Sequence, residues 1–161
     1  MDITREMDIT PEQFFNEIER TVMDDAARAT GTRPTRRKLN GLKYRKLSRQ
    51  GGKGGTEITV KILKYRYPEV YEVRFTYSTG TNTVRYHVVP RGEGGLTLTY
   101  SEKFVDPNPR SGLFADWWLK HYEKKAARRA NRTLDAIERD AKRGGGAHGS
   151  NPLLDAIENE D

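Results

Sequence analysis

Aromatic side chains with a polar end recur on one face of several predicted strands and along a later helix. The nine residues of this pattern are Tyr71, Phe75, Tyr77, Tyr86, Tyr100, Trp117, Trp118, His121 and Tyr122. Buried Tyr and Trp keep a hydroxyl or N–H that can orient a bound molecule. The pattern suits the non-enzymatic binding of a small hydrophobic or amphipathic ligand. The alternative is that these rings fill the core completely, and the sequence leaves both interpretations open.

The residue types that perform covalent or metal chemistry are sparse. The chain has no cysteine, which excludes disulfides, thiolate metal ligands and a cysteine nucleophile. His87, His121 and His148 fall in a strand, a helix and the tail without the spacing of metal ligands. No serine lies in a nucleophile elbow. We therefore expect no catalytic residue, no metal and no cofactor, with an enzyme as a minority interpretation.

Basic residues gather in two segments, residues 33–53 and 120–132, whereas residues 1–30 and the tail are net acidic. The candidates for anion binding are Arg36, Arg37, Lys38, Arg45 and Lys46. Such clusters can bind nucleic acid, an acidic protein or a membrane surface, and this is the alternative function. They can equally form a solvated surface that the acidic first helix neutralises. No nucleic-acid motif accompanies the charge, so we favour neutralisation and do not expect nucleic-acid binding.

The elements that position these residues begin with a strand and a helix. Residues 2–9 alternate between apolar and polar side chains, as a half-buried strand does. Thr10, Pro11 and Gln13 then provide an N-cap, a first-turn proline and a capping box. An apolar stripe follows as far as Gly31, where the helix should end.

The middle of the chain predicts an antiparallel meander. Residues 31–38 are a polar connector, and Leu42, Tyr44 and Leu47 suggest a weak strand. Four clearer strands follow, around residues 58–62, 71–77, 84–88 and 96–100, separated by short turn sequences that leave no room for parallel crossovers. Their apolar residues share one face, which needs a cover.

Residues 113–142 contain no Pro or Gly and carry one apolar stripe, so they predict a long helix. At about 45 Å such a helix is long enough to cross the whole sheet. We therefore expect residues 1–143 to form one α+β domain, in which the first helix and the long C-terminal helix are the candidates to cover the apolar face of an antiparallel sheet. Residues 144–161 are a flexible Gly-rich linker and an acidic tail, whose Leu153, Leu154 and Ile157 could mediate self-association.

The overall composition is that of a cytoplasmic protein. The net charge is +6 and the mean hydropathy is -0.89, so no stretch of apolar residues is long enough to span a membrane. The first residues lack the basic segment and apolar core of a secretory signal.

Several stretches resemble a known superfamily. They are residues 3–5 running into 10–15, Gly80 to Tyr86, Leu98 to Glu102, and Leu134 to Glu138, within an order of strand, helix, meander and long helix. The chain is similar to the START-like (SRPBCC, Bet v 1-like) superfamily of helix-grip folds, and within it to a bacterial family of unknown function. The resemblance covers about residues 1–142. It implies a sheet that wraps around the last helix and an apolar ligand held between them.

Overall fold

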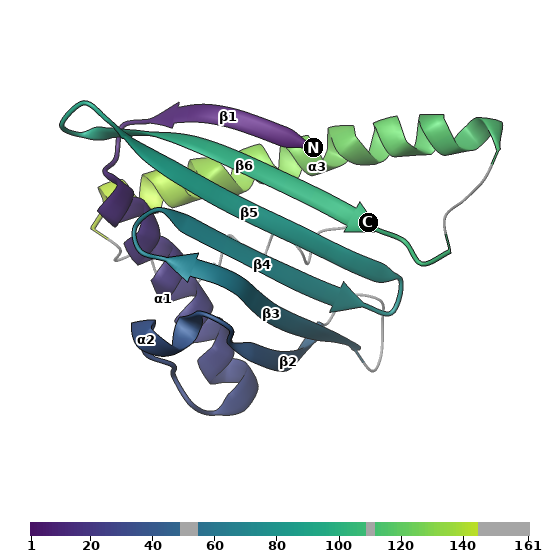
Figure 1. The fold of residues 1–161 in the computed structure, drawn as a ribbon, viewed down its shortest axis with the longest axis horizontal. Helices are drawn as coiled ribbons and strands as arrows, with labels where there is room; N and C mark the ends of the chain where they lie inside the picture. The colour runs from purple at the N-terminus through teal and green to yellow at the C-terminus, as the bar shows by residue number, and fades with distance from the viewer. Residues whose placement is uncertain (49–54, 109–111, 145–161) are drawn as a thin grey trace.

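The computed structural model describes residues 1–48, 55–108 and 112–144, and the side chains of residues 113 and 114 are outside the description. Within these ranges, six strands form one sheet and two long helices lie on the same face of it (Figure 1). The strands are β1 (Asp2–Met7), β2 (Lys43–Ser48), β3 (Thr56–Arg66), β4 (Val70–Tyr77), β5 (Gly80–Arg91) and β6 (Gly95–Val105). The helices are α1 (Pro11–Thr30), α2 (Arg36–Leu39) and α3 (Leu113–Lys142). The α+β class and the antiparallel meander predicted from the sequence are confirmed.

The strand order is β1-β6-β5-β4-β3-β2, and every neighbouring pair is antiparallel. The register aligns Tyr65, Tyr71, Tyr86 and Tyr100 side by side across β3, β4, β5 and β6. Because alternate residues point to opposite faces, this whole row lies on the face that the helices cover. The register thus gathers tyrosines that are far apart in the sequence.

Helix α1 begins as its sequence predicts. Thr10 Oγ1 accepts a hydrogen bond from Gln13 N, and Gln13 Oε1 accepts one from Thr10 N, so both halves of the capping box form. Gly31 closes the helix with a φ of 80°, a left-handed conformation that glycine adopts without strain. The apolar stripe of α1 then packs into the core through Phe14, Phe15 and Ile18.

Only the carboxyl-terminal half of α3 packs closely. Its buried apolar residues are Ala126, Ala130, Leu134, Ile137 and Ala141. The amino-terminal half projects beyond the sheet edge (Figure 1), where Trp117 and Leu119 are 65% and 51% exposed. Helix α3 therefore does not use its full length to cover the sheet, and α1 packs on the same face. In the part of the chain that the structure describes, no helix is long and apolar enough to cross a membrane.

Two local features differ from the sequence analysis. The expected polar connector contains the single turn α2, whose Leu39 is buried. In β2, Tyr44 faces the core but Leu47 is 70% exposed, because alternation puts residues 44 and 47 on opposite faces. Lys46, not Leu47, occupies the inward position of β2 next to Tyr44. It forms an ion pair with Asp25 of α1.

Candidate functional site

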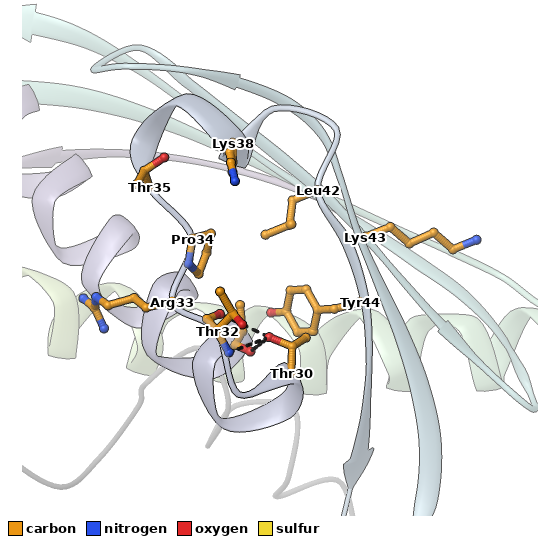
Figure 2. Close-up of a pocket in the computed structure, with 10 residues that line it drawn as sticks. Thr30, Thr32, Arg33, Pro34, Thr35, Lys38, Leu42, Lys43 and Tyr44 are labelled. Carbon is orange, nitrogen blue, oxygen red and sulfur yellow. Dashed lines mark hydrogen bonds between the residues drawn. The ribbon is translucent and has the colours of Figure 1, made fainter.

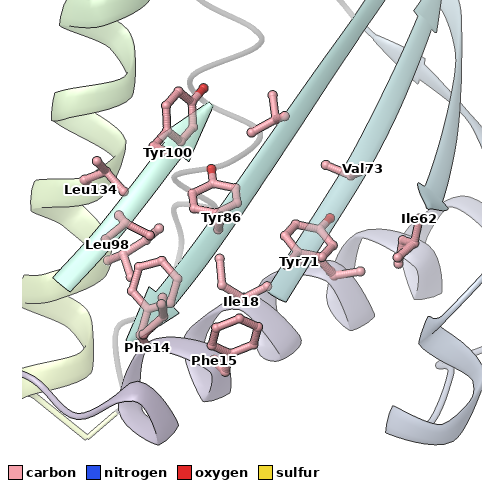
Figure 3. Packing of buried hydrophobic residues seen from close by; sticks show 14 of the residues in the cluster. Phe14, Phe15, Ile18, Ile62, Tyr71, Val73, Tyr86, Leu98, Tyr100 and Leu134 are labelled. Atoms are coloured by element: carbon pink, nitrogen blue, oxygen red, sulfur yellow. The ribbon is translucent and has the colours of Figure 1, made fainter. Parts of the chain in front are cut away.

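The centre of the fold is an aromatic core. Phe14 and Phe15 of α1 lie beneath the tyrosine row (Figure 3). The ring centroids of Phe14 and Tyr86 are 5.9 Å apart, and those of Tyr86 and Tyr100 are 5.2 Å apart. These are the separations of packed aromatic pairs. Tyr71, Tyr86 and Tyr100 are each at most 5% exposed, so their rings serve mainly as core.

The open space lies to one side, between β6 and the projecting half of α3. It is a groove of about 720 Å³, within the usual size range of small-molecule sites. Its aromatic wall consists of Phe104, Trp118 and Tyr122. The Phe104 and Tyr122 centroids are 5.6 Å apart, and Trp118 stacks on Tyr122 at 5.7 Å. Ala115, Leu119 and Ala126 extend the apolar lining along α3.

The groove continues around the edge of the sheet. Pairing between β1 and β6 ends at Asp2 and Ser101, so the last part of β6 extends past β1. Polar residues of the outer face therefore join the lining, among them Asp2, Arg85, Ser101 and Lys103. The lining combines apolar side chains, most of them on α3, with polar side chains on the strands and at Asp116 and Glu123 of α3. An amphipathic molecule requires such a combination.

Glu102 lines the groove and is the centre of a buried polar cluster. Its side chain is 2% exposed. Asn82 Nδ2 donates to Glu102 Oε1 at 2.7 Å, Tyr100 Oη donates to Oε2 at 2.9 Å, and Arg129 Nη2 donates to Oε1 at 2.7 Å. A buried carboxylate needs such partners, because an unpaired charge in this environment is costly. The cluster connects β5 and β6 to α3.

The cluster leaves one acceptor unused. Asn82 is 7% exposed, and its Oδ1 has no hydrogen-bond partner among the described residues. The amide cannot be reversed without loss, because its nitrogen already donates to Glu102. A buried carbonyl of this kind costs about 1–3 kcal/mol until a donor reaches it.

The buried tyrosines are neutral hydroxyls. Burial raises the pKa of Tyr71, Tyr86 and Tyr100 well above its ordinary value. Their hydroxyl ends point to one side, away from α1 (Figure 3). Those of Tyr71 and Tyr86 find no hydrogen-bond partner in the described part of the chain, whereas that of Tyr100 donates to Glu102. None of the three can serve as a base near neutral pH.

The structure divides the nine residues predicted from the sequence into three groups. Trp118 and Tyr122 line the groove. Five lie on the inner face of the sheet, where Tyr71, Tyr86 and Tyr100 are buried and Phe75 and Tyr77 are half-buried. Trp117 and His121 stack on each other, with centroids 5.5 Å apart, on the exposed side of α3. They do not face the sheet, because neighbouring residues of a helix are about 100° apart.

The sequence patterns did not indicate Glu102, Asn82, Arg129 or Phe104 as residues of the site. Glu102 did carry a signal, since it occupies an inward position in an otherwise apolar strand. Arg129 was grouped with the solvated face of α3. Its contact with Glu102 depends on the docking angle of the helix, and sequence spacing does not contain that angle.

Part of the first basic segment is neutralised by α1. Arg33 pairs with Asp24, Arg36 with Glu19, and Lys46 with Asp25 at 3.1 Å. Arg36 also lies over the ring of Tyr67, 3.7 Å from its centroid. Arg45 pairs with Glu57 at 3.6 Å on the surface. Of the five anion-binding candidates, only Arg37 and Lys38 lack an ion pair with a described residue.

A small pocket of about 190 Å³ lies where this segment meets the end of α1. Thr30, Thr32, Pro34, Leu42 and Tyr44 line it (Figure 2). Lys43 and Arg33 contribute to the lining, but their charged ends point away from the centre. The cations therefore do not converge on one anion. Among the described residues, no three His, Asp or Glu side chains cluster as metal ligands do.

Comparison with known families decides the placement of the chain. A family model described as "Domain of unknown function (DUF3284)" matches residues 1–113. The chain belongs to the DUF3284 family. The matched residues comprise the whole sheet with α1 and α2. A search of curated proteins finds no match for this DUF3284 chain.

Solved structures place the DUF3284 chain in the START-like, helix-grip fold. The Bet v 1 homologue Ara h 8.0201 superposes with a TM-score of 0.61 at 9% identity, covering 89% of this chain and 97% of the other. A START superfamily protein from Mycobacterium smegmatis gives 0.58 at 12% identity, covering 89% and 97%. A protein of unknown function from Staphylococcus aureus, SA2116, gives 0.56 at 14% identity, covering 90% and 94%. The resemblance to this superfamily is confirmed, and it extends to the fold.

Proposed function

We propose that the DUF3284 chain binds a small amphipathic molecule in the groove between β6 and α3, without transforming it chemically. The observation that carries this proposal is the combination of an aromatic wall, Phe104, Trp118 and Tyr122, with the buried polar cluster around Glu102. The apolar part of the ligand packs against the wall. Its polar end lies toward Glu102.

The charges of the cluster favour a neutral polar end on the ligand. Arg129 already compensates Glu102 at 2.7 Å, so an added anion or cation would lack a counter-charge there. A hydroxyl or amide group suits this end of the groove, because it forms hydrogen bonds without bringing a charge.

The same contacts argue against acid–base catalysis. A general base needs a free lone pair near the reacting proton, and Glu102 accepts three hydrogen bonds from described residues, one of them from a cation. The tyrosine beside it is held neutral by its raised pKa. The cluster is therefore suited to holding a polar group in place.

Titration with N-phenyl-1-naphthylamine, a neutral dye that fluoresces in apolar surroundings, tests the proposal on the full chain. We expect saturable binding that Trp118→Ala and Tyr122→Ala each weaken about tenfold, because each removes a large apolar contact. Trp117→Ala is the matched control, since it removes an aromatic ring from the opposite side of the same helix. Native mass spectrometry of freshly purified protein should show a bound molecule that Tyr122→Ala loses.

Two results would contradict the proposal. One is dye binding that does not saturate. The other is an equal loss of affinity in Trp117→Ala and Tyr122→Ala, which would mean that the dye reports general surface apolarity.

A further inference from the structure

The outward face of α3 combines unpaired basic side chains with an exposed tryptophan. It consists of Trp117, Lys120, Lys124, Arg128 and Arg132. All five are exposed, and none of the four cations forms an ion pair with a residue that the structure describes. We propose that this face docks onto an anionic phospholipid surface.

The basic residues of segment 33–48 and those of the α3 face differ in their ion pairs. In residues 33–48, Arg33, Arg36, Arg45 and Lys46 pair with carboxylates, whereas Arg37, Lys38 and Lys43 have no ion pair with a described residue. The two segments look alike in the sequence, but the α3 face has four such cations together in one row on a single helix. An anionic surface attracts such charges, and each one near the surface strengthens binding about fivefold.

The five side chains of this face form one row along α3. At about 100° per residue, the five side chains fall within a sector of about 120° and extend over about 22 Å. This sector lies opposite the buried stripe of Ala126, Ala130 and Ile137. Asp135 is the next acidic residue along the face, and Arg5 binds it at 2.5 Å. The basic row is therefore continuous and turned away from the sheet.

Trp117 indicates a lipid surface. It is 65% exposed and precedes the basic row near the amino-terminal end of α3. Tryptophan is favoured at the headgroup level of membranes, where its ring is partly buried and its N–H stays hydrated. A helix that is basic on its outer side and carries an exposed Trp is suited to lying flat on such a surface.

Vesicle co-sedimentation of the full chain tests this proposal. The vesicles are phosphatidylcholine alone, or phosphatidylcholine with about one third phosphatidylglycerol. We expect binding to the anionic vesicles only, and weakening as salt is added. Lys124→Glu with Arg128→Glu should lower the partition coefficient at least tenfold, since charge reversal replaces attraction by repulsion. Trp117→Ala should weaken binding without changing its salt dependence.

Arg37→Glu with Lys38→Glu is the matched control. It changes the net charge by the same amount, at exposed residues of α2 far from α3 along the chain, and should lower partitioning by less than about threefold. Circular dichroism checks that both double variants are folded. Equal losses in the two double variants would overturn the proposal, as would binding of a single-stranded oligonucleotide without binding of vesicles.

Discussion

Glu102 shows how a single inward charge can organise a site. It is nearly inaccessible to solvent, yet it joins Asn82, Tyr100 and Arg129 from two strands and a helix. Buried ion pairs contribute little net stability relative to apolar packing, but breaking one is expensive. The main role of the cluster is therefore to fix the position of α3 on the sheet beside the groove.

Replacing Glu102 should be costly, and the cost should depend on Arg129. We expect Glu102→Gln to lower the free energy of unfolding by about 3 kcal/mol, because it removes the carboxylate that Arg129 Nη2 contacts at 2.7 Å in a buried cluster. Glu102→Leu with Arg129→Met should cost less than the sum of the two single changes, since both members of the ion pair are removed together. Urea denaturation of the four proteins measures the coupling.

The surface pair of Arg45 and Glu57 provides the control for this cycle. Their side chains are 73% and 60% exposed and their charged atoms are 3.6 Å apart. Exposed pairs contribute about 1 kcal/mol or less, so Glu57→Gln should have almost no effect. A cost for Glu102→Gln as small as that of Glu57→Gln would contradict the assignment of Glu102 as a buried anchor.

At the scale of elements, charged residues on the inner face of the sheet specify how the helices dock. Arg5 of β1 binds Asp135 of α3, and Lys46 of β2 binds Asp25 of α1. β1 and β2 are the two edge strands. Inward-pointing charges on edge strands discourage pairing with another sheet. Arg5 and Lys46 each also bind a carboxylate on a covering helix. The charged residues that interrupt the apolar alternation therefore form contacts that dock the helices.

The start of α1 allows a test at this scale with a control built into the chain. Thr10→Ala should destabilise the protein by about 1 kcal/mol, because it removes a cap that the structure shows intact. Thr35 is the N-cap of α2 but makes no side-chain capping bond, so Thr35→Ala should change stability by a few tenths of a kcal/mol at most. Thermal unfolding compares the two. A cost for Thr10→Ala as small as that for Thr35→Ala would mean that the Thr10 cap does not stabilise the protein.

Local signals predicted the long elements well and the short ones poorly. α1 has a cap, a proline and a stripe, and α3 has an uninterrupted stripe, so both were predicted from residue types alone. α2 has a single turn and no such signals. In β2 the inward Lys46 hid the alternation, because its partner Asp25 is 21 residues away in sequence. Contacts of this kind are set by docking, which periodicity does not describe.

At the scale of the whole molecule, the buried tyrosines should make the fold sensitive to alkali. Burial raises the pKa of Tyr44, Tyr65, Tyr71, Tyr86 and Tyr100 above the ordinary value of 10.0. Below that value the hydroxyls are protonated in both the folded and the unfolded chain. Above it the unfolded chain loses protons that the folded chain retains, so stability falls as pH rises. Each tyrosine contributes up to about 1.4 kcal/mol per pH unit.

Tyr71→Phe and Tyr86→Phe test this dependence. Neither hydroxyl has a hydrogen-bond partner in the described part of the chain, so phenylalanine should preserve packing and change stability little at neutral pH. Each variant should lower the slope of stability against pH by up to about 1.4 kcal/mol per unit above about pH 10. Urea denaturation between about pH 8 and 11 measures the slope. An unchanged slope in both variants would show that these hydroxyls ionise in the folded state.

The tail stays a prediction. Self-association through Leu153, Leu154 and Ile157 concerns residues outside the described ranges, as does the expected linker from residue 145 onward.

The sequence by itself determined the α+β class, the antiparallel meander, the cap of α1 and the extent of α3, because each depends on residues close together in the chain. Only the tertiary structure decided that the tyrosine row is core and that the groove lies beside it. Phe14 and Phe15 fill the space under the tyrosines, and the projecting half of α3 leaves Trp118 and Tyr122 facing open space. Whether an aromatic ring fills a core or lines a groove depends on what packs against it, and that partner comes from a distant part of the chain.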